Sequence, residues 1–169
     1  MGESTMSTSI RIRTAQREDL DALVDFSVAL ALESEGVRLD RATVTKGIAA
    51  VLKDPTKATY YVAECRTESG AYALAGQLMI TYEWSDWRNG TFLWIQSVFV
   101  GPEFRRKGVF RSLYGHVIER AAESDVCGVR LYVHHSNENA RQTYLNLGMI
   151  DAGYSILETQ DALLPTESA

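Results

Sequence analysis

Hydrophobic positions in the first third of the chain recur at helical spacing. Between residues 14 and 33 they fall near one face, which predicts an amphipathic helix. Asp40 stands at the N-cap position of a second such run, and Pro55 lies where that helix would have to stop. Before them, residues 10–12 alternate apolar and basic side chains, as a short strand does. The pattern predicts strand, helix, helix.

The middle of the chain changes to strand-like patterns. Residues 59–65 and 71–84 read as two strands joined by a hairpin loop, and the run 91–100 is the most strand-like of all. An Asn-Gly turn signal within residues 85–90 leads into this third strand. Three strands therefore follow one another directly, which favours antiparallel neighbours.

The C-terminal third alternates between the two patterns. A helix is expected over 108–123, a strand over 129–134, a helix over about 137–147 and a final strand near 154–159. Three strands followed by this alternation predict an α/β (α+β) fold with a mixed sheet and helices on both of its faces.

Composition sets the class of protein. A chain of 169 residues is expected to form one domain, here 9–160, between a disordered N-terminus (1–8) and a polar tail (161–169). With 46% hydrophobic and 23% charged residues it is typical of soluble globular proteins. The net charge of −5 argues against binding to nucleic acid or to an anionic membrane.

Further features point to the cytoplasm. The N-terminus has neither the basic start nor the apolar run of a signal peptide, and no stretch reaches the length of a membrane span. Cys65 and Cys127 are too few for a disulfide framework and are expected as free thiols. With three histidines in the chain, no metal site is indicated.

One basic stretch stands out in this acidic chain. Residues 103–113 read EFRRKGVFRSL, so three consecutive cations and a glycine precede the predicted helix. A helix N-terminus offers unpaired N–H groups and partial positive charge, which suit a phosphate. The spacing fits neither a P-loop nor a dinucleotide-binding fingerprint. Taken alone, the stretch is either a phosphate site or a solvated basic turn.

Its surroundings resemble those of a known family. The order of elements over residues 10–159, the stretch RRKGVF and the later NENARQTYLNLGM resemble the GNAT superfamily of acyl-CoA-dependent N-acyltransferases. The residues that match its two motifs are Arg105, Gly108, Asn137, Ala140, Tyr144 and Gly148. Phe110 stands where the family usually has Gly or Ala, and Met149 where an aromatic residue is usual.

The resemblance implies a mostly antiparallel GNAT-like central sheet and acetyl-CoA as the acyl donor. The pantetheine arm would lie along the strand at Val98, and backbone amides around Gly108 would hold the pyrophosphate. The implied cofactor-binding residues are Val98, Phe99, Val100, Arg105, Arg106, Lys107, Gly108, Val109, Phe110, Asn137 and Ala140. Phe110 keeps its backbone N–H, and its ring is expected to pack into the core.

The implied chemistry is direct attack of an amine on the thioester. An alkyl amine with a pKa near 10.4 is mostly protonated at pH 7, so a base or a desolvating site must help to deprotonate it. Tyr144 corresponds to the general acid of the family, and Glu83 is the candidate base. Asp86, His134 and His135 are further candidates for the base.

Three functions remain open at this point. The leading hypothesis is an N-acetyltransferase for a primary amine of a small molecule, with an acidic loop that favours a cationic acceptor. A protein N-terminus or a lysine is the alternative acceptor on the same fold. A non-catalytic module that senses acyl-CoA is an alternative of another class. A homodimer, formed through the tryptophan-bearing hairpin, is compatible with all three.

Overall fold

The structure, a computed structural model, describes residues 9–123 and 125–157. The chain divides into two compact units, one up to Tyr132 and the other from Val133 on, and each is described by itself. The expected disordered N-terminus 1–8 and polar tail 161–169 lie outside the described residues. The single domain expected over 9–160 stays a prediction.

The first unit is built on one mixed sheet. Its strands are β1 (Ile10–Thr14), β2 (Thr59–Arg66), β3 (Tyr72–Ser85), β4 (Gly90–Ile95), β5 (Phe99–Val100) and β6 (Val126–Leu131). The order is β1-β2-β3-β4-β6, and β5 pairs with β3 beyond the end of β4. All pairs are antiparallel except β4 with β6, which is parallel. The expected mixed, mostly antiparallel sheet is confirmed.

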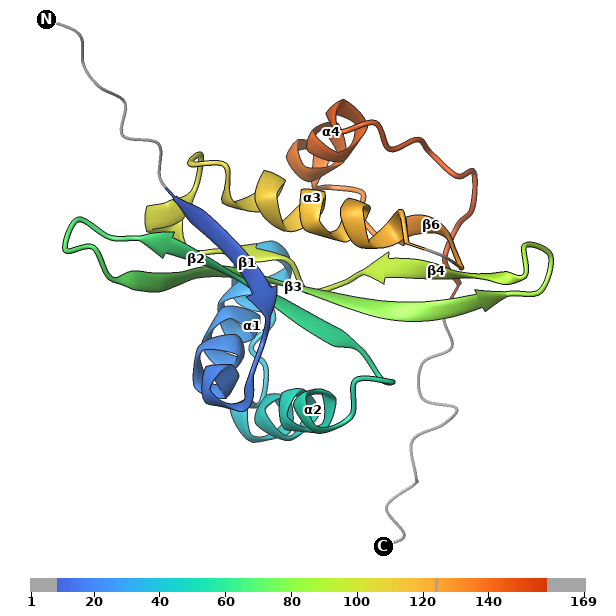
Figure 1. The fold of residues 1–169 in the computed structure, drawn as a ribbon. Coiled ribbons are helices and arrows are strands. Elements are labelled where there is room, and N and C mark those ends of the chain that lie inside the picture. The colour runs from blue at the N-terminus through green and yellow to red at the C-terminus, as the bar shows by residue number, and fades with distance from the viewer. Residues whose placement is uncertain (1–8, 124, 158–169) are drawn as a thin grey trace, which may run out of the picture. The chain divides into compact units, whose positions relative to one another are not determined.

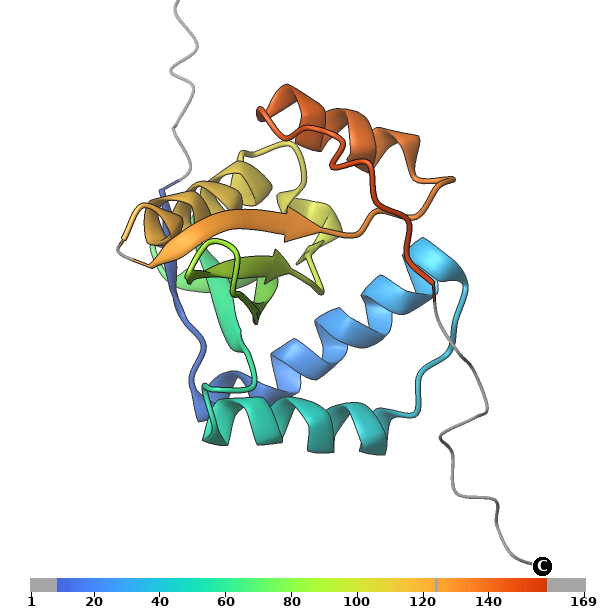
Figure 2. The same ribbon diagram turned by 90° about the vertical axis from the view of Figure 1, so that its right-hand side faces the viewer.

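Helices lie on both faces of this sheet (Figure 1). The 3₁₀ turn η1 (Arg17–Asp19) leads into α1 (Leu20–Glu35), and α1 packs with α2 (Arg41–Lys53) on one face. The short η2 (Pro102–Phe104) precedes α3 (Val109–Ala121), which covers the other face (Figure 2). Because β4 and β6 are parallel, a crossover must connect them, and α3 is that crossover.

The helix ends follow from local sequence. The Asp40 carboxylate accepts the backbone N–H of Thr43 at 2.8 Å, so it caps α2 as predicted. Helix α1 ends at Gly36, whose φ of 69° is left-handed and therefore suits a residue without a Cβ.

Apolar side chains fill both interfaces of the sheet. On the α1/α2 side, Leu23, Val24 and Ile48 pack against Tyr60 and Val62 of β2, and all five are buried. On the other side, α3 buries side chains spaced about one turn apart: Val109, Leu113, Tyr114 and Val117. This double burial fixes β3 and β5 in the middle of the unit.

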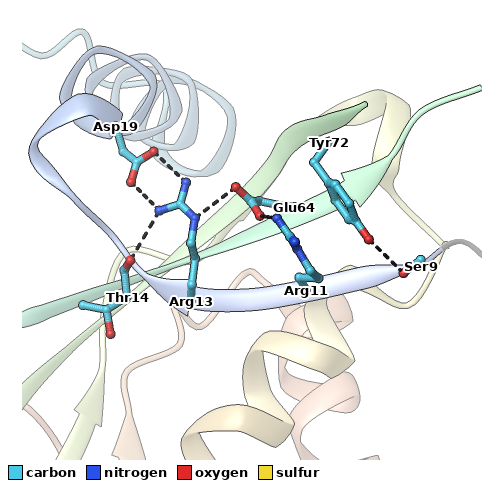
Figure 3. Close-up of polar contacts among 7 residues, drawn as sticks. All are labelled: Ser9, Arg11, Arg13, Thr14, Asp19, Glu64 and Tyr72. Carbon is cyan, nitrogen blue, oxygen red and sulfur yellow. Dashed lines mark hydrogen bonds and ion pairs between the residues drawn. The ribbon is translucent and has the colours of Figure 1, made fainter. Parts of the chain in front are cut away.

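A charged network joins β1, η1 and β2 (Figure 3). The Arg13 guanidinium donates to both carboxylate oxygens of Asp19, at 2.7 and 2.9 Å, and to Glu64 at 2.9 Å. Arg11 donates to Glu64 at 2.8 Å and lies over the ring of Tyr72. The Arg13 guanidinium holds the pKa of the buried Asp19 carboxyl below its ordinary value. The network therefore ties the first strand to its neighbour.

Three sequence predictions need correction. The strand expected over 91–100 is interrupted at 96–98, because the chain takes four residue steps from 95 to 99 where the paired stretch of β3 takes three, from 80 to 77. This extra residue is the kind of insertion that breaks a ladder. The strand expected over 129–134 runs over Val126–Leu131 instead. It can include Gly128 because this residue, having no Cβ, fits against the ring of Phe92 on β4.

The third correction concerns the last predicted strand. Residues 154–157 form no strand, and 158–159 lie outside the described residues. Alternating apolar residues make a strand only where a neighbour supplies hydrogen bonds, and the sequence pattern does not report that neighbour.

Among the described residues, no helix is both long and apolar enough to cross a membrane.

Candidate functional site

The break at residues 96–98 leaves a strand edge open in the middle of the first unit. Before the break, β4 is paired on both sides, with β3 and with β6, and its ladder with β6 ends at Ile95 and Leu131. After the break, β5 pairs with β3 and with no other strand in the described part of the chain. The outer edge of β5 is therefore available to another extended group.

The main-chain direction of β5 shows which groups face outward. The amide of Gly101 donates to the carbonyl of Ala75 at 2.9 Å, so residue 101 faces β3. Successive residues of a strand point their N–H and C=O groups to alternate sides. Val100 therefore presents its groups at the open edge, where they can pair with an extended amide-bearing arm such as pantetheine, and Val98 lies at the end of the break just before β5.

Immediately after this edge, the chain forms a tight loop that leads into α3. Arg106 has a φ of 60° and Gly108 a φ of 87°, so two of the residues before the helix are left-handed. A left-handed arginine is strained, and such strain is maintained where surrounding structure or function requires it. No side chain caps the N-terminus of α3. The i→i−4 hydrogen bonds of a helix do not use the amides of its first turn. The loop thus offers N–H donors of the kind that bind phosphate.

The three cations of this stretch do different things. Arg105 turns back over β5: its Nε donates to the carbonyl of Val100 at 3.0 Å, and its Nη2 to Glu33 of α1 at 2.6 Å. Arg106 and Lys107 are exposed at the loop. Because these charges lie beside an open edge and an uncapped helix end, the described residues fit a phosphate-bearing cofactor with an extended arm.

Phe110 lies in the first turn of α3. Its side chain is half-buried, with its ring centroid 6.1 Å from that of Tyr114. Val109 takes the fully buried position of this turn, and the ring of Phe110 lies at the margin of the core beside the buried Tyr114.

A polar and aromatic cluster covers the sheet face opposite α3 near the break. Glu83 accepts hydrogen bonds from Arg130 Nη1 at 3.0 Å and from the indole N–H of Trp94. Arg130 also lies 3.6 Å above the ring of Phe92, and the rings of Trp94 and Tyr132 are 4.5 Å apart. Two donors thus hold the carboxylate proposed as the base. The rings of Trp94 and Tyr132 lie beside it, close to the end of the β4–β6 ladder.

The other candidate bases have local roles. The carboxylate of Asp86 accepts the backbone N–H of Trp87 at 2.9 Å in the exposed hairpin turn. His134 is within 2.8 Å of the Ser136 hydroxyl and accepts the backbone N–H of that residue. Gln96, which is not a candidate base, lies in the break itself, and its side-chain amide donates to the hydroxyl of Thr81 at 3.2 Å.

The second unit contains the other family motif. The Asn137 side chain accepts the backbone N–H of Ala140 at 3.1 Å and so caps α4 (Glu138–Asn146). Tyr144 lies half-buried on this helix, and its carbonyl accepts the N–H of Met149 at 3.1 Å. Asn137 and Ala140 therefore form the N-terminal cap of the helix that carries Tyr144.

Two residues at the site were missed by the sequence analysis. Glu33 is 72 positions from Arg105, and Arg130 is 47 positions from Glu83. No local spacing connects either pair, so only the tertiary fold reveals them. In the described part of the chain, no cluster of three or more His, Cys, Asp or Glu side chains is arranged to hold a metal ion.

Comparison with known proteins agrees with this geometry. The Acetyltransferase (GNAT) family matches residues 25–149. A possible acetyltransferase from Clostridium difficile 630 is 43% identical, with a TM-score of 0.81 over 89% of this chain and 97% of that chain. No curated protein matches the chain at a significant level.

More distant solved structures share the fold. A predicted acetyltransferase from Clostridium acetobutylicum, solved with acetyl-CoA, is 14% identical with a TM-score of 0.69 over 89% of this chain and 96% of that one. Glucosamine-6-phosphate N-acetyltransferase from Arabidopsis thaliana is 16% identical, with a TM-score of 0.66 over 90% and 99% of the two chains. Because the family match covers most of the chain and includes the loop, α3 and the motif of α4, this chain belongs to the GNAT family of acetyltransferases.

Proposed function

We propose that this protein transfers the acetyl group of acetyl-CoA to a primary amine of a small molecule. The observation that carries the proposal is the open outer edge of β5, which leads directly into a cationic loop and an uncapped helix N-terminus. Acetyl-CoA, when bound, supplies an acetyl thioester that an amine can attack. The remaining work falls to the residues of the chain.

The donor side uses backbone more than side chains. Val98 and Val100 would pair with the pantetheine arm as a neighbouring strand would. The amides around Gly108 and the first turn of α3 would hold the pyrophosphate, supported by the charges of Arg106 and Lys107. A side chain at position 110 leaves these amides in place.

The acceptor side is proposed on the face that carries Glu83. Glu83, held by Arg130 and Trp94, would take through water the proton that the ammonium form of the acceptor must lose before its nitrogen can attack the thioester. Tyr144 would give its phenolic proton to the sulfur as the carbon–sulfur bond breaks. The nitrogen loses its second proton to water as the amide forms, and the phenolate regains a proton from water, so that the products are the amide, a free thiol and one released proton. The role of Tyr144 rests on the motif of residues 137–148 that it shares with the family.

Two similar structures show why the fold alone does not choose the acceptor. One is named as a glucosamine-6-phosphate N-acetyltransferase and another as a ribosomal-protein-alanine N-acetyltransferase. A small acceptor is favoured here because the described cluster is compact: one carboxylate and one guanidinium lie beside the rings of Phe92, Trp94 and Tyr132. A carboxylate and a guanidinium side by side suit an amine that also carries an acidic group, in addition to the cationic amines that Glu83 alone would favour.

The test begins with binding. Melting temperatures are measured with acetyl-CoA, CoA, ATP and NAD. A ligand at a hundred times its dissociation constant adds about 2.7 kcal/mol, or roughly 5–10 °C for a domain of this size. We expect a shift with the CoA species only. The absence of a shift at millimolar CoA would contradict the proposal.

Turnover is then measured as release of free thiol with a panel of diamines, amino acids, amino sugars and peptides. The Tyr144→Phe variant is expected to lose at least tenfold in kcat while its affinity for acetyl-CoA stays the same, because it lacks the proton donor but keeps the donor site. Binding without turnover on any amine would favour the acyl-CoA-sensing module, and turnover confined to peptides would favour a protein acceptor.

A further inference from the structure

Arg105 makes two contacts that join separate parts of the first unit. Its Nε donates to the carbonyl of Val100 at 3.0 Å, and its Nη2 pairs with Glu33 near the end of α1 at 2.6 Å. Its guanidinium carbon lies 5.6 Å from the ring centroid of Phe99. About half of each side chain in the ion pair is exposed, at 45% for Arg105 and 47% for Glu33. The guanidinium is therefore held against β5 from the side of α1.

The position of this guanidinium coincides with the open edge. Since Gly101 faces β3 through its bond to Ala75, the carbonyl of Val100 points to the other side, and Arg105 binds it there. An arm that runs along the edge of β5 needs the same carbonyl and the same space. An arm of acetyl-CoA placed along this edge would therefore compete with Arg105 for it.

We propose that Arg105 is a latch on the donor site and that Glu33 holds this latch closed. The inference rests on the proposed function, since it concerns the site assigned there to acetyl-CoA. Binding of the donor displaces Arg105 from Val100, breaks its pair with Glu33 and frees its charge for the phosphates. Glu33 is thus a positioning residue: it touches neither donor nor acceptor, and it acts on donor affinity through Arg105.

The sign of the effect follows from the competition. Removing the charge of Glu33 weakens the closed latch, so acetyl-CoA has less to displace and binds more tightly. An exposed ion pair of this kind corresponds to at most about a fivefold change in an equilibrium constant. High salt screens the pair and reduces the difference between variant and wild type.

The experiment compares Glu33→Gln with Glu35→Gln by calorimetric titration with acetyl-CoA. Glu35 is an exposed carboxylate two residues further along α1, with no ion pair among the described residues, so its variant measures the general effect of removing one negative charge. We expect Glu33→Gln to lower the Kd about two- to fivefold and Glu35→Gln to change it less than 1.5-fold. At 1 M salt the two variants should agree.

A double-mutant cycle checks the route through Arg105. In an Arg105→Gln background, Glu33→Gln should change the Kd no more than Glu35→Gln does. Equal effects of the two glutamate variants in the wild-type background, or weaker binding by Glu33→Gln, would overturn the latch while leaving the proposed function intact. If the wild-type protein bound no CoA species, the proposed function itself would fail, and the latch with it.

Discussion

Glu83 shows how the setting of one residue shapes its expected behaviour. The Arg130 guanidinium and the indole N–H of Trp94 fix the orientation of its carboxylate on the face opposite α3. Its contribution as a base should matter most where the acceptor amine is protonated. At a pH near the amine pKa of about 10.4, the amine becomes free without help.

The substitution Glu83→Gln tests this role. We expect kcat/KM to fall at least tenfold at pH 7 and the defect to shrink steadily toward pH 10, because an increasing fraction of the amine is already neutral. The control is Asp86→Asn, which changes a carboxylate in the exposed hairpin turn and should leave the pH–rate profile unchanged. A defect of Glu83→Gln that is independent of pH would assign Glu83 a binding or structural role.

At the scale of elements, the placement of β5 depends on a glycine in β3. A Cβ built on Gly76 would stand 2.5 Å from the carbonyl oxygen of Phe99, so the two strands approach as they do only because no side chain intervenes. An alanine at 76 must push β5 outward and so displace the edge that the donor is proposed to use.

We therefore expect Gly76→Ala to destabilise the protein by about 1–3 kcal/mol and to weaken binding of acetyl-CoA. Gly47→Ala is the matched control, because a Cβ on Gly47 in α2 meets nothing within 4 Å. That substitution should raise stability by about 0.5–1 kcal/mol and leave the affinity unchanged. Urea unfolding and calorimetric titration of both variants measure the two quantities. Unchanged donor affinity in Gly76→Ala would contradict the placement of the donor along β5.

Local signals predicted most elements of the first unit. Asp40 and Pro55 bounded α2, and the apolar period predicted α3, because caps and periods act within a few residues. The break at 96–98 left no such signal, since an extra residue in a ladder is visible only against the partner strand. The start of β6 was missed for a similar reason. Glycine disfavours a strand in sequence, and only the fold shows that the ring of Phe92 packs where a side chain of residue 128 would lie.

The loop before α3 carries a stronger local signal in the sequence than the sheet face around Glu83 does. The stretch RRKGVF carries its own signal, because cations, glycine and helix start are adjacent in sequence. Glu33 and Arg130 gave none, because each acts on a partner brought close only by packing of the sheet. The sequence could therefore identify Arg105 as a cation of the site but not the contact that holds it.

At the scale of the whole molecule, the network of Arg11, Arg13, Asp19 and Glu64 makes stability depend on pH. The guanidinium of Arg13 lowers the pKa of Asp19, and that of Arg11, with help from Arg13, lowers the pKa of Glu64. A carboxylate with a depressed pKa stabilises the folded state above its unfolded pKa, about 4, and this contribution is lost as pH falls through the folded value. Stability should therefore decline from about pH 4 downward.

The substitution Asp19→Asn removes the buried member of this network. We expect a loss of about 2 kcal/mol at pH 7 and a shallower decline of stability below pH 4, because hydrogen bonds to a charged group are lost and one titrating carboxylate disappears. Asp25→Asn is the control: its pair with Arg41 is exposed at both ends and should matter by less than about 1 kcal/mol. Urea unfolding between pH 3 and pH 7 gives both values. Parallel pH profiles for Asp19→Asn and wild type would contradict the assignment.

The contact between Arg105 and the carbonyl of Val100 also bears on the tendency of the protein to aggregate when no cofactor is bound. An unpaired strand edge is a template on which another polypeptide can add, and such edges are sites of aggregation. Arg105 covers the outward carbonyl of β5 with a charged group, and an incoming strand would have to displace that group to pair with the carbonyl. The side chain proposed to compete with acetyl-CoA would therefore also oppose the addition of another strand at this edge, so that resistance of the empty protein to aggregation would come with a lower affinity for the donor.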